Sequence, residues 1–120
     1  MWRYLVREIG RLGRTSTYSC QGFRAAWRSE KSVRQWAVAQ VLSVGLAFVL
    51  DLTAGERALI IALGFIVLAA ELLNTAIEAI VDLASPERHP LAGKAKDCGS
   101  AAVALSAVGA GLAWAVILIF

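Results

Sequence analysis

The alternation of apolar and polar stretches predicts three membrane-spanning helices behind a basic N-terminal segment. Long apolar runs occupy residues 32–50, 57–82 and 99–120. Each is close to the roughly 20 residues that a helix needs to cross the hydrocarbon core of a bilayer. Because 120 residues leave no room for a second core, we predict an all-α fold in which residues 1–120 form one integral membrane domain.

Short polar segments connect the predicted spans. DLTAGER, at 51–57, is expected to form a tight outer loop. ASPERHPLAGKAKD, at 84–97, contains two prolines and a glycine, which predict an ordered turn region and not a continuous helix. We therefore expect the third helix to begin only at about residue 99.

Residues 1–31 predict an interfacial region on the membrane surface. Over 2–14, arginines occupy much of one helical face, and apolar side chains recur on the other at Trp2, Leu5, Val6, Ile9 and Leu12. We expect this amphipathic helix to break at 15–19, with Thr17 or Ser19 capping a second surface helix over about 20–30. No signal peptide is predicted, because the segment lacks an unbroken apolar run.

The second apolar run carries acids where they are energetically unfavourable. Glu71, Asn74, Glu78 and Asp82 are separated by 3, 4 and 4 positions, so they lie on one face of a helix. A carboxylate in mid-membrane costs at least about 2.5–3.5 kcal/mol. We predict that this stripe faces a site that holds water, a metal or a ligand. The alternative is that these polar groups only bind neighbouring helices together.

Composition and charge support the membrane assignment and orient the chain. Hydrophobic residues make up 58% and charged residues 18%, which is typical of integral membrane proteins. The two further apolar runs disfavour the alternative of a soluble bundle. Eight of the twelve Lys and Arg residues precede residue 35, so we expect a cytoplasmic N-terminus and, after three spans, a periplasmic C-terminus. No soluble nucleic-acid-binding fold accompanies the net charge of +3, so no nucleic-acid partner is predicted. Cys20 and Cys98 are expected to be reduced thiols.

The polar residues could together support phosphoryl transfer. The acid stripe and the basic segment after it supply carboxylates for Mg²⁺, a lysine for phosphate and a spare carboxylate for proton abstraction. No Walker P-loop, G-x-G-x-x-G or H-E-x-x-H motif is present, so a nucleotide site must be unconventional. Glu30 is either an intrahelical partner of Arg34 at i+4 or a functional carboxylate, and spacing alone does not decide between these.

The stretch ELLNTAIEAIVD, followed by ERHPLAGKAKDCGSAAV, closely resembles the prokaryotic diacylglycerol kinases, which are small three-span membrane lipid kinases. The likeness extends upstream to YSCQGFRAAWRSE, and the pattern E-x-x-N-x-x-x-E-x-x-x-D followed by K-D-x-G-S-A is highly specific. The resemblance implies transfer of the γ-phosphoryl of MgATP to the primary hydroxyl of diacylglycerol, giving phosphatidate. It also implies a homotrimer in the bacterial inner membrane, with sites that combine helices from neighbouring subunits.

The resemblance implies roles for individual residues. Glu71 matches the catalytic base, and Glu30 and Glu78 match the metal-binding glutamates, which favours the functional interpretation of Glu30. The positions that match nucleotide contacts are Arg11, Tyr18, Glu30, Glu78, Glu87, Arg88, His89, Lys96 and Asp97. The positions that match the lipid-binding side and active-site support are Arg11, Arg24, Ala25, Ala26, Trp27, Gln35, Asn74 and Ser100.

Two alternative functions remain open at this point. The related undecaprenol kinases share the acidic motif and the chemistry, although the Arg34-Gln35 pair is more similar to the diacylglycerol branch. Trp36 departs from that branch, since its members carry an acid at this position. The second alternative is a small ion-translocating membrane oligomer that uses Glu71 as its ion site. Glu30 and the Lys96-Asp97 pair argue against it, because a proton path needs neither.

Overall fold

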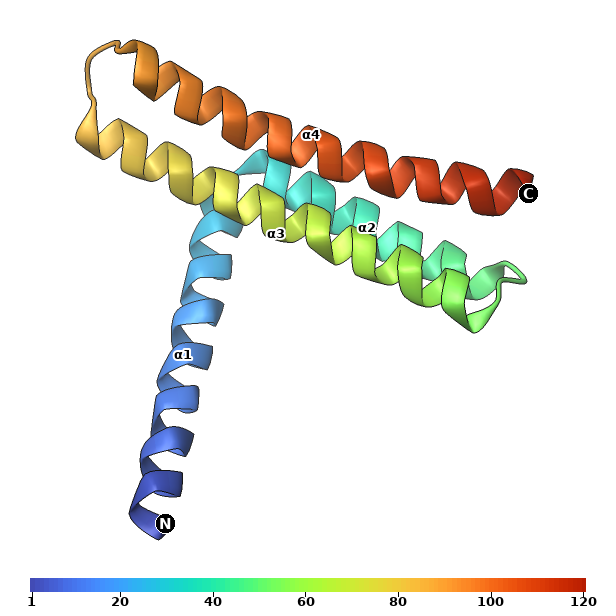
Figure 1. Ribbon diagram of the computed structural model, residues 1–120, viewed down its shortest axis with the longest axis horizontal. Coiled ribbons are helices and arrows are strands. Elements are labelled where there is room, and N and C mark those ends of the chain that lie inside the picture. The colour runs from blue at the N-terminus through green and yellow to red at the C-terminus, as the bar shows by residue number, and fades with distance from the viewer.

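The computed structural model describes residues 1–120 as four helices. They are α1 (Trp2–Ser29), α2 (Lys31–Val49), α3 (Ala54–Ala84) and α4 (Pro90–Ile119). Helices α2, α3 and α4 run side by side, and α1 projects away from them at a steep angle (Figure 1). Because α2, α3 and α4 are each long and apolar enough to cross a membrane, the prediction of an all-α fold with three helices that could span a membrane is confirmed.

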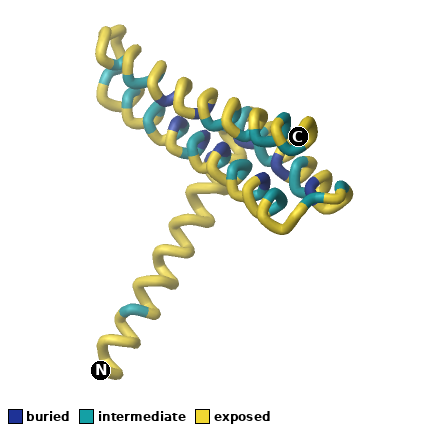
Figure 2. The backbone as a smooth tube through the Cα atoms, turned by 45° about the vertical axis from the view of Figure 1, so that its right-hand side comes forward, coloured by how far each residue is buried: buried dark blue, intermediate teal, exposed yellow.

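The N-terminal region forms one unbroken helix, so the prediction of two short helices was wrong. The hydroxyls of Thr15, Thr17 and Ser19 donate to the carbonyl oxygens four residues earlier, each at 3.0 Å. These hydroxyls are satisfied inside α1, and for that reason they neither break it nor cap a second helix. Almost all of α1 is exposed (Figure 2). Its one buried residue, Ala26, is in the last turn of the helix.

A sharp elbow separates α1 from α2. Glu30 is the one residue between them and is extended, with φ −110° and ψ 115°. The guanidinium of Arg34 reaches back across the elbow and donates to the carbonyl oxygens of Trp27 at 2.5 Å and Arg28 at 3.3 Å. A cation is favoured there because the last carbonyls of a helix are unpaired and carry partial negative charge. Arg34 therefore stabilises the elbow, and its intrahelical ion pair with Glu30 does not form.

The connection between α2 and α3 is shorter than the loop predicted over 51–57. Helix α3 begins at Ala54 because Thr53 and Glu56 form a capping box. The Glu56 N–H donates to the Thr53 hydroxyl at 3.2 Å, and the Thr53 N–H donates to the Glu56 carboxylate at 2.8 Å. The capping box satisfies two of the backbone donors at the helix start, which extends the helix by one turn.

The connection between α3 and α4 is also shorter than the turn region predicted over 84–97, because residues 91–97 are helical. Helix α4 begins at Pro90, which is tolerated in the first turn because its missing N–H would have no partner there. The N–H of Leu91 donates to the ring nitrogen Nδ1 of His89 at 3.1 Å, which caps the helix. Only residues 85–89 remain outside the helices.

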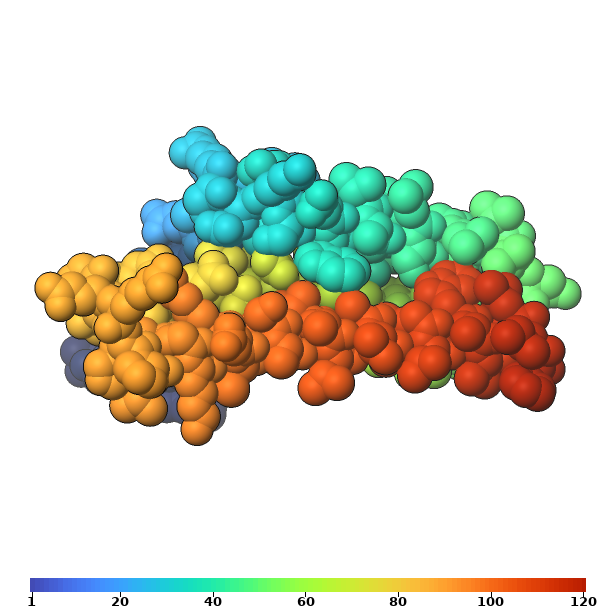
Figure 3. Space-filling model, turned by 90° about the horizontal axis from the view of Figure 1, so that it is seen from above, coloured from blue at the N-terminus to red at the C-terminus, as the bar shows by residue number.

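Helix α3 is the centre of the bundle. Both α2 and α4 pack on it, but they do not pack on each other. A groove therefore runs between α2 and α4, with α3 as its floor (Figure 3). One hydrogen bond bridges the groove, from the indole Nε1 of Trp114 on α4 to the hydroxyl of Ser43 on α2 at 2.9 Å.

The elbow lies beside the middle of α3, because α2 has 19 residues and α3 has 31. Ser32 in the first turn of α2 contacts Glu71, so α3 continues past the elbow to Ala84 without α2 beside it. The α3–α4 hairpin consequently extends beyond the elbow (Figure 1). At 1.5 Å per residue α2 itself is about 28 Å long, which matches the thickness of a bilayer's hydrocarbon core.

Two buried amides lie against glycines at the interfaces of α3. The Gln40 Nε2 donates to the carbonyl oxygen of Ile61 at 3.1 Å, and its Oε1 lies where a Cβ at Gly64 would sit. The Oδ1 of Asn74 lies against Gly99 in the same way. Neither amide oxygen accepts a conventional hydrogen bond, so a Cα–H···O contact with the glycine is the interaction left to it.

We expect Gly64→Ala to lower the free energy of unfolding by about 1–3 kcal/mol, because the added methyl group would displace the Gln40 amide. Thermal unfolding in detergent measures the change. Gly109→Ala is the matched control, since a Cβ there meets nothing within 4 Å. Adding Gln40→Ala to Gly64→Ala should recover much of the loss, and equal stability of the two glycine variants would contradict this packing.

Candidate functional site

The predicted polar stripe forms one face of α3, and its burial decreases toward the end of the helix. Glu71 and Asn74 are buried, with 5% and 9% of their surfaces exposed. Glu78 is half-buried and Asp82 is exposed. The stripe therefore leads from the packed bundle out to the α3–α4 hairpin.

Glu71 is held between α3 and the first turn of α2. The hydroxyl of Ser32 donates to its Oε1 at 2.5 Å, and no hydrogen bond within the chain reaches its Oε2. The carboxylate faces the N-terminal turn of α2, where unpaired backbone N–H groups favour negative charge. Glu71 is thus a fixed carboxylate with one oxygen available to a substrate.

Asn74 and Glu78 continue the stripe beyond Glu71. The Nδ2 of Asn74 lies 3.5 Å from Oε1 of Glu78, one turn along the same helix. This contact is at the long limit for a hydrogen bond, so it orients the Glu78 carboxylate only weakly. The remaining lone pairs of Glu78 are free to take a ligand.

An ion pair joins α3 to α4 at the C-terminal end of the stripe, near the connection between these two helices. The ammonium of Lys96 lies 2.5 Å from Oδ1 of Asp82. Lys96 belongs to the first two turns of α4, ahead of the apolar stretch that begins at Gly99. Its hydrogen bond to the Asp82 carboxylate raises the pKa of the Lys96 ammonium above its ordinary value. Sequence reasoning placed Asp82 on the stripe but did not pair it with Lys96, because i,i+4 spacing reveals nothing about contacts between helices.

An open polar hollow of about 530 Å³ adjoins this ion pair. Polar residues, prolines and a glycine line it, and the lining brings together four of the predicted nucleotide residues, namely Glu87, Arg88, His89 and Lys96. Asp82 lines it as well. The hollow combines two cationic side chains with hydrogen-bonding groups, which is suitable chemistry for a phosphorylated ligand.

The chain does not bring the predicted residues of α1 to this hollow. Arg11 and Tyr18 lie about 28 and 18 Å along α1 from Glu30, at 1.5 Å per residue. Arg11 instead pairs with Glu8 at 2.7 Å, and Tyr18 is exposed. The predicted lipid-side residues Arg24, Ala25, Ala26 and Trp27 lie on the last two turns of α1, and Gln35, Asp97 and Ser100 are exposed on α2 and α4.

The predicted metal ligands are two separate carboxylates. Glu30 is at the elbow, where it accepts a hydrogen bond from the Ser29 hydroxyl at 3.1 Å, and Glu78 is on the stripe. No group of three Asp, Glu, His or Cys side chains within the chain could hold a metal. Mg²⁺ usually takes one or two carboxylates and completes its shell with phosphate oxygens and water. The oxygen donors of Glu30 and Glu78 therefore fit magnesium that arrives with a nucleotide.

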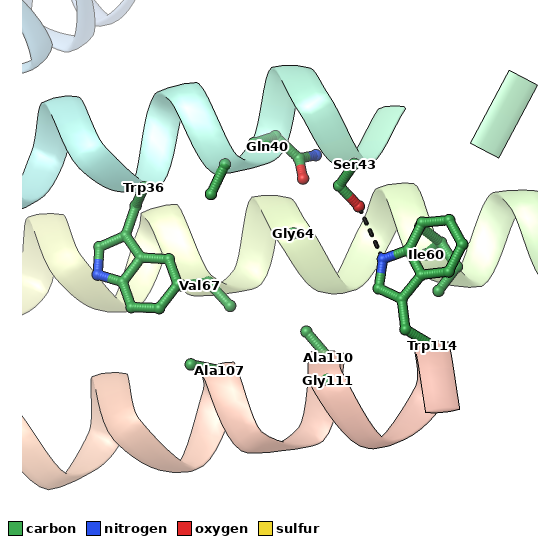
Figure 4. Close-up of a pocket in the computed structure, with 11 residues that line it drawn as sticks. Trp36, Gln40, Ser43, Ile60, Gly64, Val67, Ala107, Ala110, Gly111 and Trp114 are labelled. Atoms are coloured by element: carbon green, nitrogen blue, oxygen red, sulfur yellow. Dashed lines mark hydrogen bonds between the residues drawn. The ribbon is translucent and has the colours of Figure 1, made fainter. Parts of the chain in front are cut away.

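The groove between α2 and α4 contains an apolar cavity of about 280 Å³ (Figure 4). Ile60, Gly64 and Val67 form its floor, and they are spaced 4 and 3 positions apart. Glu71 follows Val67 by one further turn, so the floor of the groove and the acid stripe are one continuous face of α3. Trp36 and Trp114 line the walls from α2 and α4.

Comparison with known proteins supports the predicted resemblance. The family model described as prokaryotic diacylglycerol kinase matches residues 17–118. A Pseudomonas aeruginosa protein named diacylglycerol kinase is 47% identical over 111 residues, which are 92% of this chain and 90% of that protein. The protein of the same name from Escherichia coli K12 is 44% identical, over 90% and 88%, and that from Haemophilus influenzae is 37% identical, over 98% and 99%. The chain therefore belongs to the prokaryotic diacylglycerol kinase family.

Proposed function

We propose that this protein is a membrane-embedded lipid kinase that transfers the γ-phosphoryl of ATP to the primary hydroxyl of diacylglycerol, giving phosphatidate. The observation that carries the proposal is the continuous face of α3. It runs from the apolar groove through Glu71 to the polar hollow. An apolar acceptor entering from one side and a polar nucleotide from the other would meet at the Glu71 carboxylate.

The geometry suggests where this meeting point lies in the membrane. If α1 rests on the surface of the bilayer, the elbow at Glu30 marks the boundary of the hydrocarbon core, and α2 crosses that core. Glu71 then lies at that boundary, with Glu78 and Asp82 on the aqueous side of it. Carboxylates at this depth need not be desolvated by lipid, which removes the energetic difficulty of acids in mid-membrane. The excess of basic residues in α1 makes this the cytoplasmic surface of the inner membrane.

The chemistry assigned to Glu71 is general base catalysis. Its free Oε2 would accept the proton of the lipid's primary hydroxyl while that oxygen forms a bond to the γ-phosphorus. The bond between the γ-phosphorus and the bridging oxygen breaks, and ADP leaves with the electron pair. Glu71 retains the proton until the product phosphate departs.

The remaining residues would hold the nucleotide. Lys96 and Arg88 in the polar hollow supply positive charge to the polyphosphate, and the Asp82 carboxylate holds the Lys96 ammonium in place. Glu30 and Glu78 would bind Mg²⁺, which neutralises charge on the phosphates when it is bound with ATP. His89 and Glu87 lie in the loop beside these groups, where an adenosine would extend.

A homotrimer is part of the proposal. The single chain leaves α1 uncovered, and it does not bring Arg11 or Tyr18 to the polar hollow. It also leaves α2 and α4 apart. Neighbouring subunits that contribute α1 or α2 would complete the set of nucleotide and metal ligands. Small exposed residues on α4 outside the groove, such as Ala101 and Ala102, allow the close helix contact on which association in membranes depends.

The groove would hold an acyl chain of the lipid acceptor, since it leads directly away from Glu71 toward the membrane interior. We expect Ala110→Phe, which fills the cavity, to raise the KM for a long-chain diacylglycerol several-fold while the KM for ATP is unchanged. Ala104→Phe on the exposed side of α4 is the matched control. Equal KM values for both variants and the wild type would remove the groove from lipid binding.

A direct assay tests the proposed function. Purified protein in mixed micelles is given Mg²⁺ and γ-labelled ATP with either dioleoylglycerol or undecaprenol. We expect label in phosphatidate and little in undecaprenyl phosphate. Preferential labelling of undecaprenol would mean that the acceptor is undecaprenol and that the phosphoryl-transfer chemistry is the same. Labelling of neither lipid, together with ATP-independent, pH-driven ion flux in liposomes, would overturn the kinase.

A further inference from the structure

The contact between Ser32 and Glu71 carries an inference about the catalytic geometry, and it depends on the proposed kinase function. Ser32 is the second residue of α2, and its hydroxyl donates to Oε1 of Glu71 at 2.5 Å. It is the one hydrogen bond that any side chain in the molecule gives to this carboxylate. Only 5% of the Glu71 surface is exposed.

The hydroxyl of Ser32 has no competing structural role. Helix α2 has no side-chain hydrogen bond at its N-cap, which is Glu30, so Ser32 does not cap the helix. Thr15, Thr17 and Ser19 in α1 and Ser106 in α4 donate within their own helices, and Ser29 donates to the neighbouring Glu30. Ser32 instead reaches across to α3, over a sequence separation of 39 residues.

The hydrogen bond from Ser32 to Oε1 of Glu71 determines which carboxylate oxygen is left to accept a proton. A glutamate side chain has three rotatable bonds, and an unattached carboxylate would sample several orientations. With Oε1 held by Ser32, the carboxylate plane is fixed and Oε2 is the oxygen left to take a proton. Catalysis by a general base depends on such fixed geometry, because a small displacement of the base reduces the rate strongly.

Serines at the elbow also donate hydrogen bonds to two carboxylates, those of Glu30 and Glu71. Ser29 donates to Glu30 at 3.1 Å and Ser32 donates to Glu71 at 2.5 Å. The three residues Glu30 to Ser32 therefore connect a predicted metal ligand to the predicted base. Any movement of the elbow would be transmitted to Glu71 through the Ser32 hydroxyl.

We propose that Ser32 is a positioning residue for the proton-abstracting carboxylate of Glu71, acting through its hydroxyl and touching neither the nucleotide nor the lipid. The Ser32 hydroxyl keeps Oε2 of Glu71 directed at the primary hydroxyl of the lipid. It also keeps the Glu71 carboxylate in a fixed position relative to Glu30. Removing it leaves binding intact and slows the chemical step.

The test compares Ser32→Thr with Ser32→Val, two side chains of nearly the same shape that differ in the hydroxyl. We expect Ser32→Val to lower kcat about 10- to 100-fold, the effect of losing a hydrogen bond to a charged group. The KM values for ATP and dioleoylglycerol should stay within about threefold of wild type, a margin worth less than one such bond. Ser32→Thr should retain most of the turnover. Ser106→Ala, which removes a hydroxyl that bonds only within α4, should behave as wild type.

The outcomes separate this inference from the function it depends on. A wild-type protein that phosphorylates no lipid overturns the kinase itself. An active wild type with equal kcat for Ser32→Val and Ser32→Thr overturns the role of the hydroxyl. A Ser32→Val protein that loses kcat but also unfolds at a lower temperature than Ser32→Thr would assign Ser32 to stability and not to positioning. Loss of kcat in Ser32→Val alone, at unchanged unfolding temperature, supports the inference.

Discussion

Replacing Glu71 by glutamine should lower kcat for lipid phosphorylation by about 10²–10⁴-fold, which is the contribution usual for a general base. Glutamine keeps the shape of the side chain, and its carbonyl oxygen can still accept the hydrogen bond from Ser32. The amide cannot take the proton of the acceptor hydroxyl. Initial rates with saturating ATP, Mg²⁺ and dioleoylglycerol measure the change, and KM for ATP should change little.

The matched control for this variant is Glu56→Gln, the same substitution on the same helix. Glu56 lies at the opposite end of α3, in a capping box where glutamine serves as well as glutamate. Full turnover by a folded Glu71→Gln protein would exclude Glu71 as the base. Comparable losses in both variants would instead point to a general effect on α3.

The elements of the fold that the sequence predicted were those fixed by local periodicity. The apolar runs gave the three spanning helices to within a few residues on α2 and α3. The spacing of Glu71, Asn74, Glu78 and Asp82 placed them on one face, since helix geometry alone determines that relation. The wrong predictions concerned helix ends. Thr15 and Pro90 were expected to interrupt helices, yet an i−4 hydrogen bond and a first-turn position accommodate them.

Contacts between helices could not be predicted, because they depend on how the helices pack. Nothing in the sequence indicates that Ser32 lies beside Glu71, or that Lys96 pairs with Asp82. Both contacts require the register of α3 against a second helix. The apolar groove likewise results from α2 and α4 packing on α3 and not on each other. The roles assigned to Glu30 and to the residues of α1 came from family resemblance, and they stay predictions.

Glu78→Gln is expected to weaken the use of magnesium strongly. The substitution removes one of two predicted carboxylate ligands while its amide can still contact Asn74. The Mg²⁺ concentration for half-maximal rate should rise by about tenfold or more, because loss of even an outer partner of a metal site reduces affinity by about 10–100-fold. Titrating Mg²⁺ at fixed ATP measures this directly.

The position of Glu78 makes this titration informative about the whole site. Glu78 lies between Glu71, where the lipid would react, and Asp82, which holds Lys96 beside the polar hollow. If the nucleotide is oriented through magnesium at Glu78, excess Mg²⁺ should restore part of the rate in Glu78→Gln but none of it in Glu71→Gln. Glu56→Gln should show the wild-type titration. An unchanged Mg²⁺ dependence in Glu78→Gln would mean that the metal is held elsewhere, and the direction assigned to the bound nucleotide along α3 would then be wrong.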